Sequence, residues 1–182
     1  MIRLASEADA PGILAIYAPI VKSSPISFET EPPTQAEMAR RIRDTLVKYP
    51  WLVYDDFGEI AGYAYATAHR TRAAYQWSVE TSVYVAEAFR RRRIAQQLYG
   101  ALFAVLAAQG FVNAYAGITL PNAASVALHE AVGFKPFAVF RGIGFKMGGW
   151  HDVGWWERTL RDRPASPSPP KLLAHVLAEP EE

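Results

Sequence analysis

Apolar residues recur at helical spacing from residue 95 to residue 109, where Leu98, Leu102 and Leu106 fall on one face. This pattern predicts an amphipathic helix that packs on a sheet. The apolar residues 82–85 before it predict the end of a strand, and the polar segment between the two predicts a loop. We expect this strand, loop and helix to form the unit around which the rest of the chain is arranged.

The same kinds of pattern predict the other elements in chain order. Strands are expected at residues 2–4, 51–54, 60–68, 77–85, 114–120, 134–140 and 149–160, and further helices at about 10–21, 35–48 and 123–132. Thr34 followed by Glu37 forms a capping box, and a turn at 55–58 joins two strands as a hairpin. A glycine-rich crossing is expected at 141–148. Hairpin strands followed by a strand–helix–strand–helix–strand run predict a mixed α/β sandwich.

The domain organisation follows from a change of composition near residue 160. We expect residues 1–160 to form a single α/β domain, because the chain is too short to build two separate hydrophobic cores of ordinary size. Residues 161–182 are rich in proline, serine and charge, which predicts a disordered tail. Four apolar residues in that tail are candidates for a docking turn instead: Leu172, Leu173, Val176 and Leu177.

Composition and charge exclude several classes of function. The formal net charge of +1 is far from that of a strongly basic nucleic-acid binder. The chain has no cysteine, which excludes a disulfide, a thiolate nucleophile and a zinc–thiolate site. With no signal-like start and no long apolar run, we expect a cytoplasmic protein that does not bind membranes. The histidines lie too far apart in sequence for metal-ligand spacing, so no metal is expected.

Four consecutive arginines, Arg90, Arg91, Arg92 and Arg93, occupy the loop before the helix 95–109. A helix N-terminus leaves N–H groups unpaired and carries roughly half a positive charge, so it favours an anion. The position of the run therefore predicts a phosphate-binding loop for a phosphate-carrying cofactor. The alternative is a solvated turn or a weak nucleic-acid patch, which is what a run of like charges alone would mean.

Short motifs in a fixed order carry a family resemblance. They are Phe28 with TEP at 30–32, YPWLV at 49–53, Glu80 with SVYV at 82–85, LPN at 120–122, Ser125 with LHE at 128–130, GF at 133–134 and GWHDVG at 149–154. In this order and at this spacing the chain resembles the GNAT N-acetyltransferase family, and within it the phosphinothricin and methionine sulfoximine N-acetyltransferases. The resemblance implies a GNAT-type α/β fold: a mixed, mostly antiparallel twisted sheet with helices on both faces. It also implies acetyl-CoA as the acetyl donor.

In the family, the loop before the central helix reads Gln or Arg, two residues, Gly, one residue, then Gly or Ala. The matching residues here are Arg90, Arg93 and Ala95. Arg93 replaces a glycine, and if that position needs a positive φ an arginine costs on the order of 1 kcal/mol there. The cofactor-binding residues expected from the resemblance and the loop together are Val83, Tyr84, Val85, Arg90, Arg91, Arg92, Arg93, Ile94, Ala95, Asn122 and Ser125.

N-acetyl transfer needs a base that accepts the proton of an ammonium group. Glu80 lies in an otherwise apolar strand, and the resemblance places the family's base there; the alternative is an outward-facing glutamate in an ion pair. His129 matches a histidine of the phosphinothricin subgroup and is expected to transfer a proton, although a lone helical histidine is more often packed or capped. Backbone N–H groups of residues 83–85 are expected to polarise the thioester carbonyl. Asn122 is expected to hold the coenzyme arm, cap the helix, or both.

Substrate selection is expected from loops. Arg70, Arg72 and Tyr75 match the subgroup's region for carboxylate and phosphinate recognition, with a solvated loop as the alternative, and Phe28 is expected to wall the pocket. Glu29 stands where phosphinothricin resistance enzymes carry arginine, so a zwitterionic amino acid such as methionine sulfone or sulfoximine is at least as good a candidate as phosphinothricin.

The function expected is direct transfer of acetyl from acetyl-CoA to the α-amine of a small amino-acid-like substrate, in a ternary complex. Two alternatives stay open: a non-catalytic acyl-CoA-binding module, and a GNAT enzyme for another amine such as a polyamine, an aminoglycoside or a protein N-terminus. The resemblance also implies a homodimer, with the region 149–154 near the partner.

Overall fold

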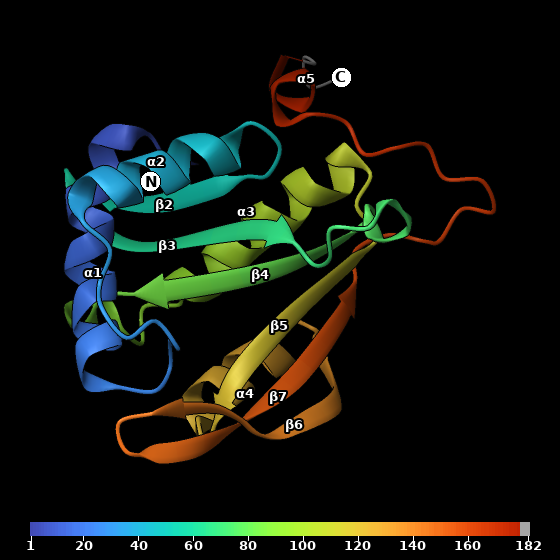
Figure 1. Ribbon diagram of the computed structural model, residues 1–182. Coiled ribbons are helices and arrows are strands. Elements are labelled where there is room, and N and C mark those ends of the chain that lie inside the picture. Colours follow the sequence, from blue (N-terminus) through green and yellow to red (C-terminus); the bar gives the residue numbers. More distant parts are fainter. Residues whose placement is uncertain (179–182) are drawn as a thin grey trace.

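The computed structural model describes residues 1–178 of the chain (Figure 1). The strands are β1 (Ile2–Leu4), β2 (Trp51–Asp56), β3 (Glu59–Ala68), β4 (Ser78–Val85), β5 (Asn113–Leu120), β6 (Lys135–Lys146) and β7 (Gly149–Thr159). The helices are α1 (Ala10–Ser23), α2 (Gln35–Leu46), α3 (Ile94–Gln109), α4 (Ala123–Ala131) and α5 (Leu173–Ala178), with short 3₁₀ turns η1 (Glu7–Asp9), η2 (Ala73–Tyr75) and η3 (Glu87–Phe89).

The strands form one seven-stranded sheet in the order β1-β2-β3-β4-β5-β7-β6. Every neighbouring pair is antiparallel except β4 and β5, which confirms the expected mostly antiparallel sheet. The parallel pairing joins only residues 78–80 to residues 113–115, after which the two strands diverge (Figure 1). Beyond this point the facing edges of β4 and β5 have no strand partner among residues 1–178.

Helices cover both faces of the sheet because β3 presents different residues to each face. Ala64 and Ala66 belong to the core under α3, whereas Tyr63 belongs to the core under α1 and α2. The predicted apolar stripe of α3 is confirmed, since Leu98 and Leu102 are fully buried.

The predicted helix ends are formed by the expected chemistry. The Thr34 hydroxyl oxygen accepts a hydrogen bond from the Glu37 backbone N–H at 3.1 Å, which caps α2. At the C-terminal end of α3, Gly110 takes the left-handed conformation with φ of 98°, as expected for a C-cap glycine.

The glycine-rich crossing predicted at 141–148 is wrong. β6 continues through this segment to Lys146, and the hairpin with β7 turns at Met147 and Gly148, which have φ of 54° and 78°. The pairing shifts register between Phe140 and Gly144, where Gly142 has φ of 53°. Glycine at positive φ forms a bulge here, which bends the strand without ending it. The glycine pattern alone does not distinguish such a bulge from a loop between two strands.

The tail differs from the expected disorder over the residues that are described. Leu173 in α5 is only 2% exposed, and the Lys171 backbone N–H donates to the Gln109 carbonyl at 2.7 Å. The Gln109 amide in turn donates to the Lys171 carbonyl at 3.0 Å. The segment before α5 therefore lies against the C-terminal end of α3, in line with the docking turn; residues 179–182 lie outside the described part. Within residues 1–178, no helix is both long and apolar enough to span a membrane.

Candidate active site

A cavity of about 650 Å³ opens where β4 and β5 diverge. Its walls come from the end of β4, the arginine loop, the first turn of α3 and one side of α4. All the expected cofactor residues except Arg92 line it: Val83, Tyr84, Val85, Arg90, Arg91, Arg93, Ile94, Ala95, Asn122 and Ser125. The loop and the strand edge, which are joined directly in sequence, thus meet α4 from a later part of the chain.

Arg92 is directed away from this cavity, contrary to the expectation. Its guanidinium lies over the Phe89 ring at 4.9 Å from the centroid, and its Nη1 is 3.8 Å from Oδ2 of Asp56. The reason is the backbone on either side, since Arg91 and Arg93 both take the left-handed conformation, with φ of 63° and 60°. The chain thereby turns neighbouring side chains of the loop to different sides.

The remaining three arginines concentrate positive charge on the loop. Within residues 1–178, Arg90, Arg91 and Arg93 form no ion pair, so their charges stand uncompensated beside the N-terminus of α3. Arg93 itself is the N-cap residue and makes no side-chain capping bond. Its φ of 60° confirms that the position usually held by glycine does need a positive φ, at a cost of about 1 kcal/mol or more.

Asn122 caps α4, as one of its two expected roles required. Its Oδ1 accepts a hydrogen bond from the Ser125 backbone N–H at 3.1 Å, and both residues line the cavity. The cap fixes the first turn of α4, and this turn places Ser125 at the cavity surface.

His129 lies behind this wall instead of on it. The side chain is buried, with Nδ1 at 2.7 Å from the Ser125 carbonyl oxygen and Nε2 at 2.8 Å from the Tyr99 hydroxyl. A carbonyl only accepts, so Nδ1 carries the proton and Nε2 accepts from Tyr99. Burial lowers the pKa of His129 and so favours the neutral ring. Ser125 connects it to the cavity, with Oγ at 3.3 Å from Nδ1.

Glu80 and His129 lie on opposite faces of β4. Thr81, next to Glu80, is paired with Ala66 and so points to the α3 side, where Tyr99 holds His129. Glu80 is paired across the sheet with Thr67 on β3 and Tyr115 on β5, so these three side chains share the other face. The structure therefore does not bring the two expected catalytic residues together.

A histidine that the sequence interpretation passed over contacts Glu80. His69 Nδ1 lies 3.0 Å from Glu80 Oε1, and the ring stacks on Tyr115 with centroids 4.5 Å apart. Strand alternation carried a signal for this contact, because His69 follows Thr67 by two residues and so falls on the same face. This signal identifies the contact only together with the strand register, which pairs Thr67 with Glu80.

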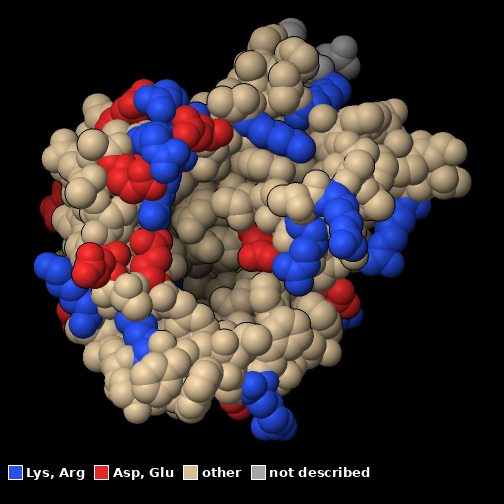
Figure 2. Space-filling model, viewed as in Figure 1, with Lys and Arg blue, Asp and Glu red and all other residues tan. Residues whose placement is uncertain are grey.

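The expected substrate residues lie on separate segments: Arg70, Arg72 and Tyr75 between β3 and β4, and Phe28 beside β6. Figure 2 shows a hollow on the face of the molecule seen in Figure 1, with acidic and basic side chains on both of its sides. Arg70 and Arg72 lie between β3 and β4 and form no ion pair within residues 1–178, and Tyr75 contacts the edge of His69. Phe28 packs on the β6 backbone at Gly144, where no side chain larger than hydrogen would fit.

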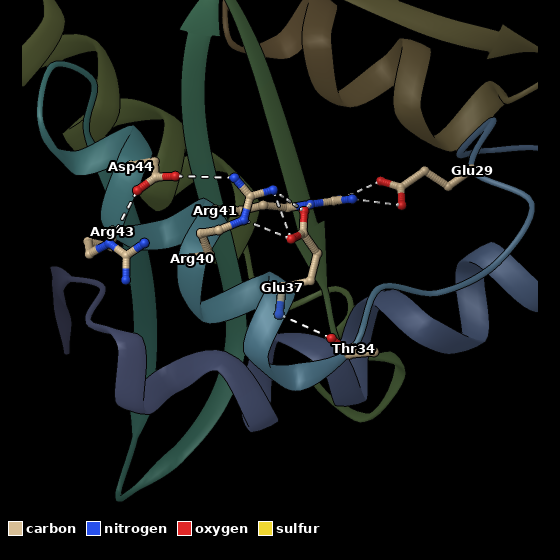
Figure 3. A network of polar contacts seen from close by, with 7 residues as sticks. All are labelled: Glu29, Thr34, Glu37, Arg40, Arg41, Arg43 and Asp44. Carbon is tan, nitrogen blue, oxygen red and sulfur yellow. Dashed lines mark hydrogen bonds and ion pairs between the residues drawn. The ribbon is translucent and has the colours of Figure 1, made fainter.

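Glu29 is held in a polar network (Figure 3). Its two carboxylate oxygens accept from Arg41 at 2.7 and 3.2 Å, and one of them also accepts from the Tyr17 hydroxyl at 2.9 Å. Burial opposes ionisation, but the bonds from Arg41 and Tyr17 outweigh it and the pKa of Glu29 lies below its ordinary value. Arg41 also donates to Glu37 at 2.9 Å, so its single positive charge faces two carboxylates.

A second, smaller cavity of about 200 Å³ adjoins this network. Its walls include Tyr63 and Tyr65 of β3, Trp51 of β2 and the side chain of Arg41. It also reaches Thr67, the strand partner of Glu80, so this aromatic cavity begins one strand away from the Glu80 carboxylate.

Residues 2–155 match the family model of the acetyltransferase (GNAT) domain. The phosphinothricin N-acetyltransferase of Streptomyces viridochromogenes is 39% identical to this chain over 96% of its length and 95% of the relative's. The L-methionine sulfoximine/L-methionine sulfone acetyltransferase of Pseudomonas aeruginosa is 35% identical, over 91% of this chain and 98% of that protein.

A solved structure shares the fold. The crystal structure of a GNAT superfamily phosphinothricin acetyltransferase from Sinorhizobium meliloti, in complex with acetyl-CoA, matches with a TM-score of 0.86 at 34% identity, over 95% of this chain and 97% of that one. The resemblance seen in the sequence motifs is confirmed by both kinds of comparison. The chain belongs to the GNAT acetyltransferase family and is an acetyl-CoA-dependent N-acyltransferase.

Proposed function

We propose that this protein transfers the acetyl group of acetyl-CoA to the α-amine of a small amino acid, by direct transfer in a ternary complex. The observation that carries the proposal is the opening between β4 and β5, with an anion site at one end and Glu80 beside it. The relatives named as phosphinothricin and methionine sulfoximine acetyltransferases support the substrate class.

The residues around the opening fit coenzyme A. Arg90, Arg91 and Arg93, together with the first N–H groups of α3, suit a diphosphate. The unpaired edge of β4 offers backbone donors to the carbonyl of a bound thioester, which supplies the activated acetyl group. The cavity is lined by Val83 and by Tyr84, neighbours whose side chains point to opposite faces of β4.

Glu80 acts as the base in this proposal. The amine of an amino acid is mostly protonated near pH 7, and the carboxylate takes up that proton before the amine attacks. Direct transfer is part of the proposal: donor and acceptor would approach the opening from opposite sides of β4, which requires no acetyl carrier on the protein.

His129 contributes from behind the wall. Its neutral ring holds the Ser125 carbonyl and contacts the Ser125 hydroxyl, so any proton that His129 supplies to the departing thiolate passes through Ser125. Burial keeps the ring neutral, which makes a direct acid role unfavourable.

The charges around the hollow favour a substrate with a neutral side chain. Arg70 and Arg72 remain available to pair with the α-carboxylate. The charge of Arg41 is already matched by Glu29 and Glu37, so it adds no uncompensated positive charge for a phosphinate. Methionine sulfone and methionine sulfoximine are therefore the proposed substrates, ahead of phosphinothricin.

A homodimer is also proposed, with β6 and β7 at its interface. Large apolar side chains on this hairpin are solvent-exposed, among them Phe145 at 59% and Trp150 at 70%. A contiguous apolar surface of this kind marks an interaction site, and Trp150 lies in the region expected near the partner. Sedimentation of the wild type against a Trp150→Ser variant tests it, since loss of the apolar contact should favour the monomer.

The test of the function is an acetyl-transfer assay with purified protein. Acetyl-CoA is mixed with L-methionine sulfone, L-methionine sulfoximine, phosphinothricin and a set of other amines, and thiol release is followed for the wild type and Glu80→Gln. Turnover with the first two that Glu80→Gln reduces to a small residual rate, while calorimetry shows unchanged acetyl-CoA binding, supports the proposal. Acetyl-CoA binding without turnover of any amine would instead support a binding module.

A further inference from the structure

His69 and Glu80 form an isolated carboxylate–imidazole pair on the substrate side of the sheet. The Nδ1–Oε1 distance is 3.0 Å, and the two side chains are 16% and 34% exposed. His69 comes from the end of β3 and Glu80 from β4, and the His69 backbone N–H bonds to the Ser78 carbonyl at 3.4 Å, which continues the ladder between the strands.

The imidazole is held in one orientation by aromatic neighbours. It stacks on Tyr115 with an interplanar angle of 25°, and its edge meets Trp155 at 6.2 Å and Tyr75 at 6.3 Å between centroids. These contacts come from β5, β7 and η2, so three separate elements define the ring plane. A ring held in this way fixes the position of its Nδ1, and with it the position of the carboxylate oxygen that it bonds.

The pair assigns the protons. A carboxylate only accepts, so Nδ1 of His69 carries the hydrogen and donates it to Oε1. Oε2 of Glu80 and Nε2 of His69 have no hydrogen-bond partner within residues 1–178, and neither belongs to the buried unpaired atoms of that part. One carboxylate oxygen is thereby tied down while the other stays accessible.

We propose that His69 is the positioning residue for the base: its Nδ1–H holds Oε1 so that Oε2 of Glu80 faces the amine of the bound amino acid. The inference rests on the proposed function, in which Glu80 accepts the amine proton. A carboxylate on a three-carbon side chain rotates freely unless one oxygen is fixed, and misplacing a reacting group by about 1 Å costs up to roughly 100-fold in rate.

Three substitutions at His69 separate the hydrogen bond from the packing. The amide nitrogen of asparagine falls where Nδ1 lies, whereas the amide of glutamine falls where Nε2 lies, and phenylalanine keeps only the stacking on Tyr115. With methionine sulfone as acceptor, His69→Gln and His69→Phe should lower kcat by about 10- to 100-fold without changing the KM for acetyl-CoA. His69→Asn should retain kcat within about threefold.

A double-substitution cycle identifies the route of the effect. If His69 acts through Glu80, His69→Phe causes no further loss in a Glu80→Gln background. Equal losses from His69→Phe in both backgrounds, or equal losses from His69→Asn and His69→Gln, would overturn the proposal. Wild-type kcat in His69→Phe would overturn it as well.

A spectroscopic readout keeps this inference separate from the proposed function. Nitrogen-15 NMR of the His69 ring at about pH 8 should show the tautomer protonated at Nδ1, and Glu80→Gln should shift that Nδ1 signal. The opposite tautomer in the wild type refutes the pair even in an active enzyme. If no amine is acetylated while the NMR result holds, the proposed function fails and the pairing stands.

Discussion

Replacing Arg93 with glycine is expected to stabilise the fold. Arg93 has φ of 60° and ψ of 16°, a left-handed conformation that costs a residue with a Cβ roughly 1–2 kcal/mol relative to its preferred regions. Glycine adopts it without that cost but gains about 0.5–1 kcal/mol of conformational entropy in the unfolded chain. The difference leaves a net stabilisation of about 0.5–1 kcal/mol.

No folded-state contact offsets this gain. The side chain of Arg93 is exposed and forms no hydrogen bond or ion pair within residues 1–178, and the capping bond of an N-cap side chain is also missing. Removing one of several crowded positive charges reduces their mutual repulsion, which acts in the same direction. For a chain of this size, 1 kcal/mol corresponds to a shift of Tm by about 2–4 °C.

The matched control is Arg90→Gly. Arg90 is also an exposed arginine of the loop, but its φ of −62° is a conformation that any residue adopts. Glycine there adds only unfolded-state entropy and should destabilise by about 0.5–1 kcal/mol. Urea and thermal unfolding of the wild type and both variants measure the difference. An Arg93→Gly protein no more stable than Arg90→Gly would refute the reasoning.

Arg93→Gly should also weaken the binding of acetyl-CoA. Arg93→Gly keeps the backbone N–H but removes one of the uncompensated charges at the N-terminus of α3. Calorimetry at low and high salt should therefore show lower acetyl-CoA affinity and a weaker salt dependence than in the wild type. Affinity that rises on substitution would mean that the side chain obstructs the phosphates instead of binding them.

Three further predictions concern stability. Asn122→Ala removes the bond to the Ser125 N–H and should cost about 1 kcal/mol in urea unfolding; a loss below a few tenths would mean that water replaces the cap. Burial holds the folded-state pKa of His129 below its ordinary value of 6.5, so its contribution is complete above that pH and is lost as the pH falls below it. Thermal unfolding between about pH 8 and pH 5 should show this decline, and His129→Leu should flatten it. The hydrogen bond from Arg3 is the main cause that lowers the pKa of Asp9 below 3.8, so this stabilisation is present above that pH and disappears as the pH falls through the lower folded value. Arg3→Met should accordingly move acid unfolding, followed by circular dichroism, to higher pH.

Local patterns in the sequence predicted most of the fold. The spacing of Leu98 and Leu102 placed α3, the Thr34–Glu37 pair placed the start of α2, and Gly110 placed the end of α3. These signals involve residues only a few positions apart, so they act locally and do not depend on tertiary contacts. The motifs at 82–85 and 120–122 then indicated the family, which the comparisons confirmed.

The parts that were missed depend on contacts between distant segments. The motif position of His129 does not show that Tyr99, 30 residues earlier, holds the ring behind the cavity wall. Glu29 looked like an unbalanced charge until α2 placed Arg41 against it. Glycines at 142 and 144 indicated that the strand ends there, but pairing with β7 continues β6 to Lys146.

The sequence by itself determined the order of elements, the arginine loop before α3 and the family, because periodicity, capping and motif spacing are properties of short segments. Only the tertiary structure decided how β4 and β5 diverge and which side chains meet at the opening. It placed His69 against Glu80 and turned Arg92 away from the cavity. The physical reason is that strand register and backbone conformation set the direction of each side chain, and both are fixed by packing between segments that the sequence keeps apart.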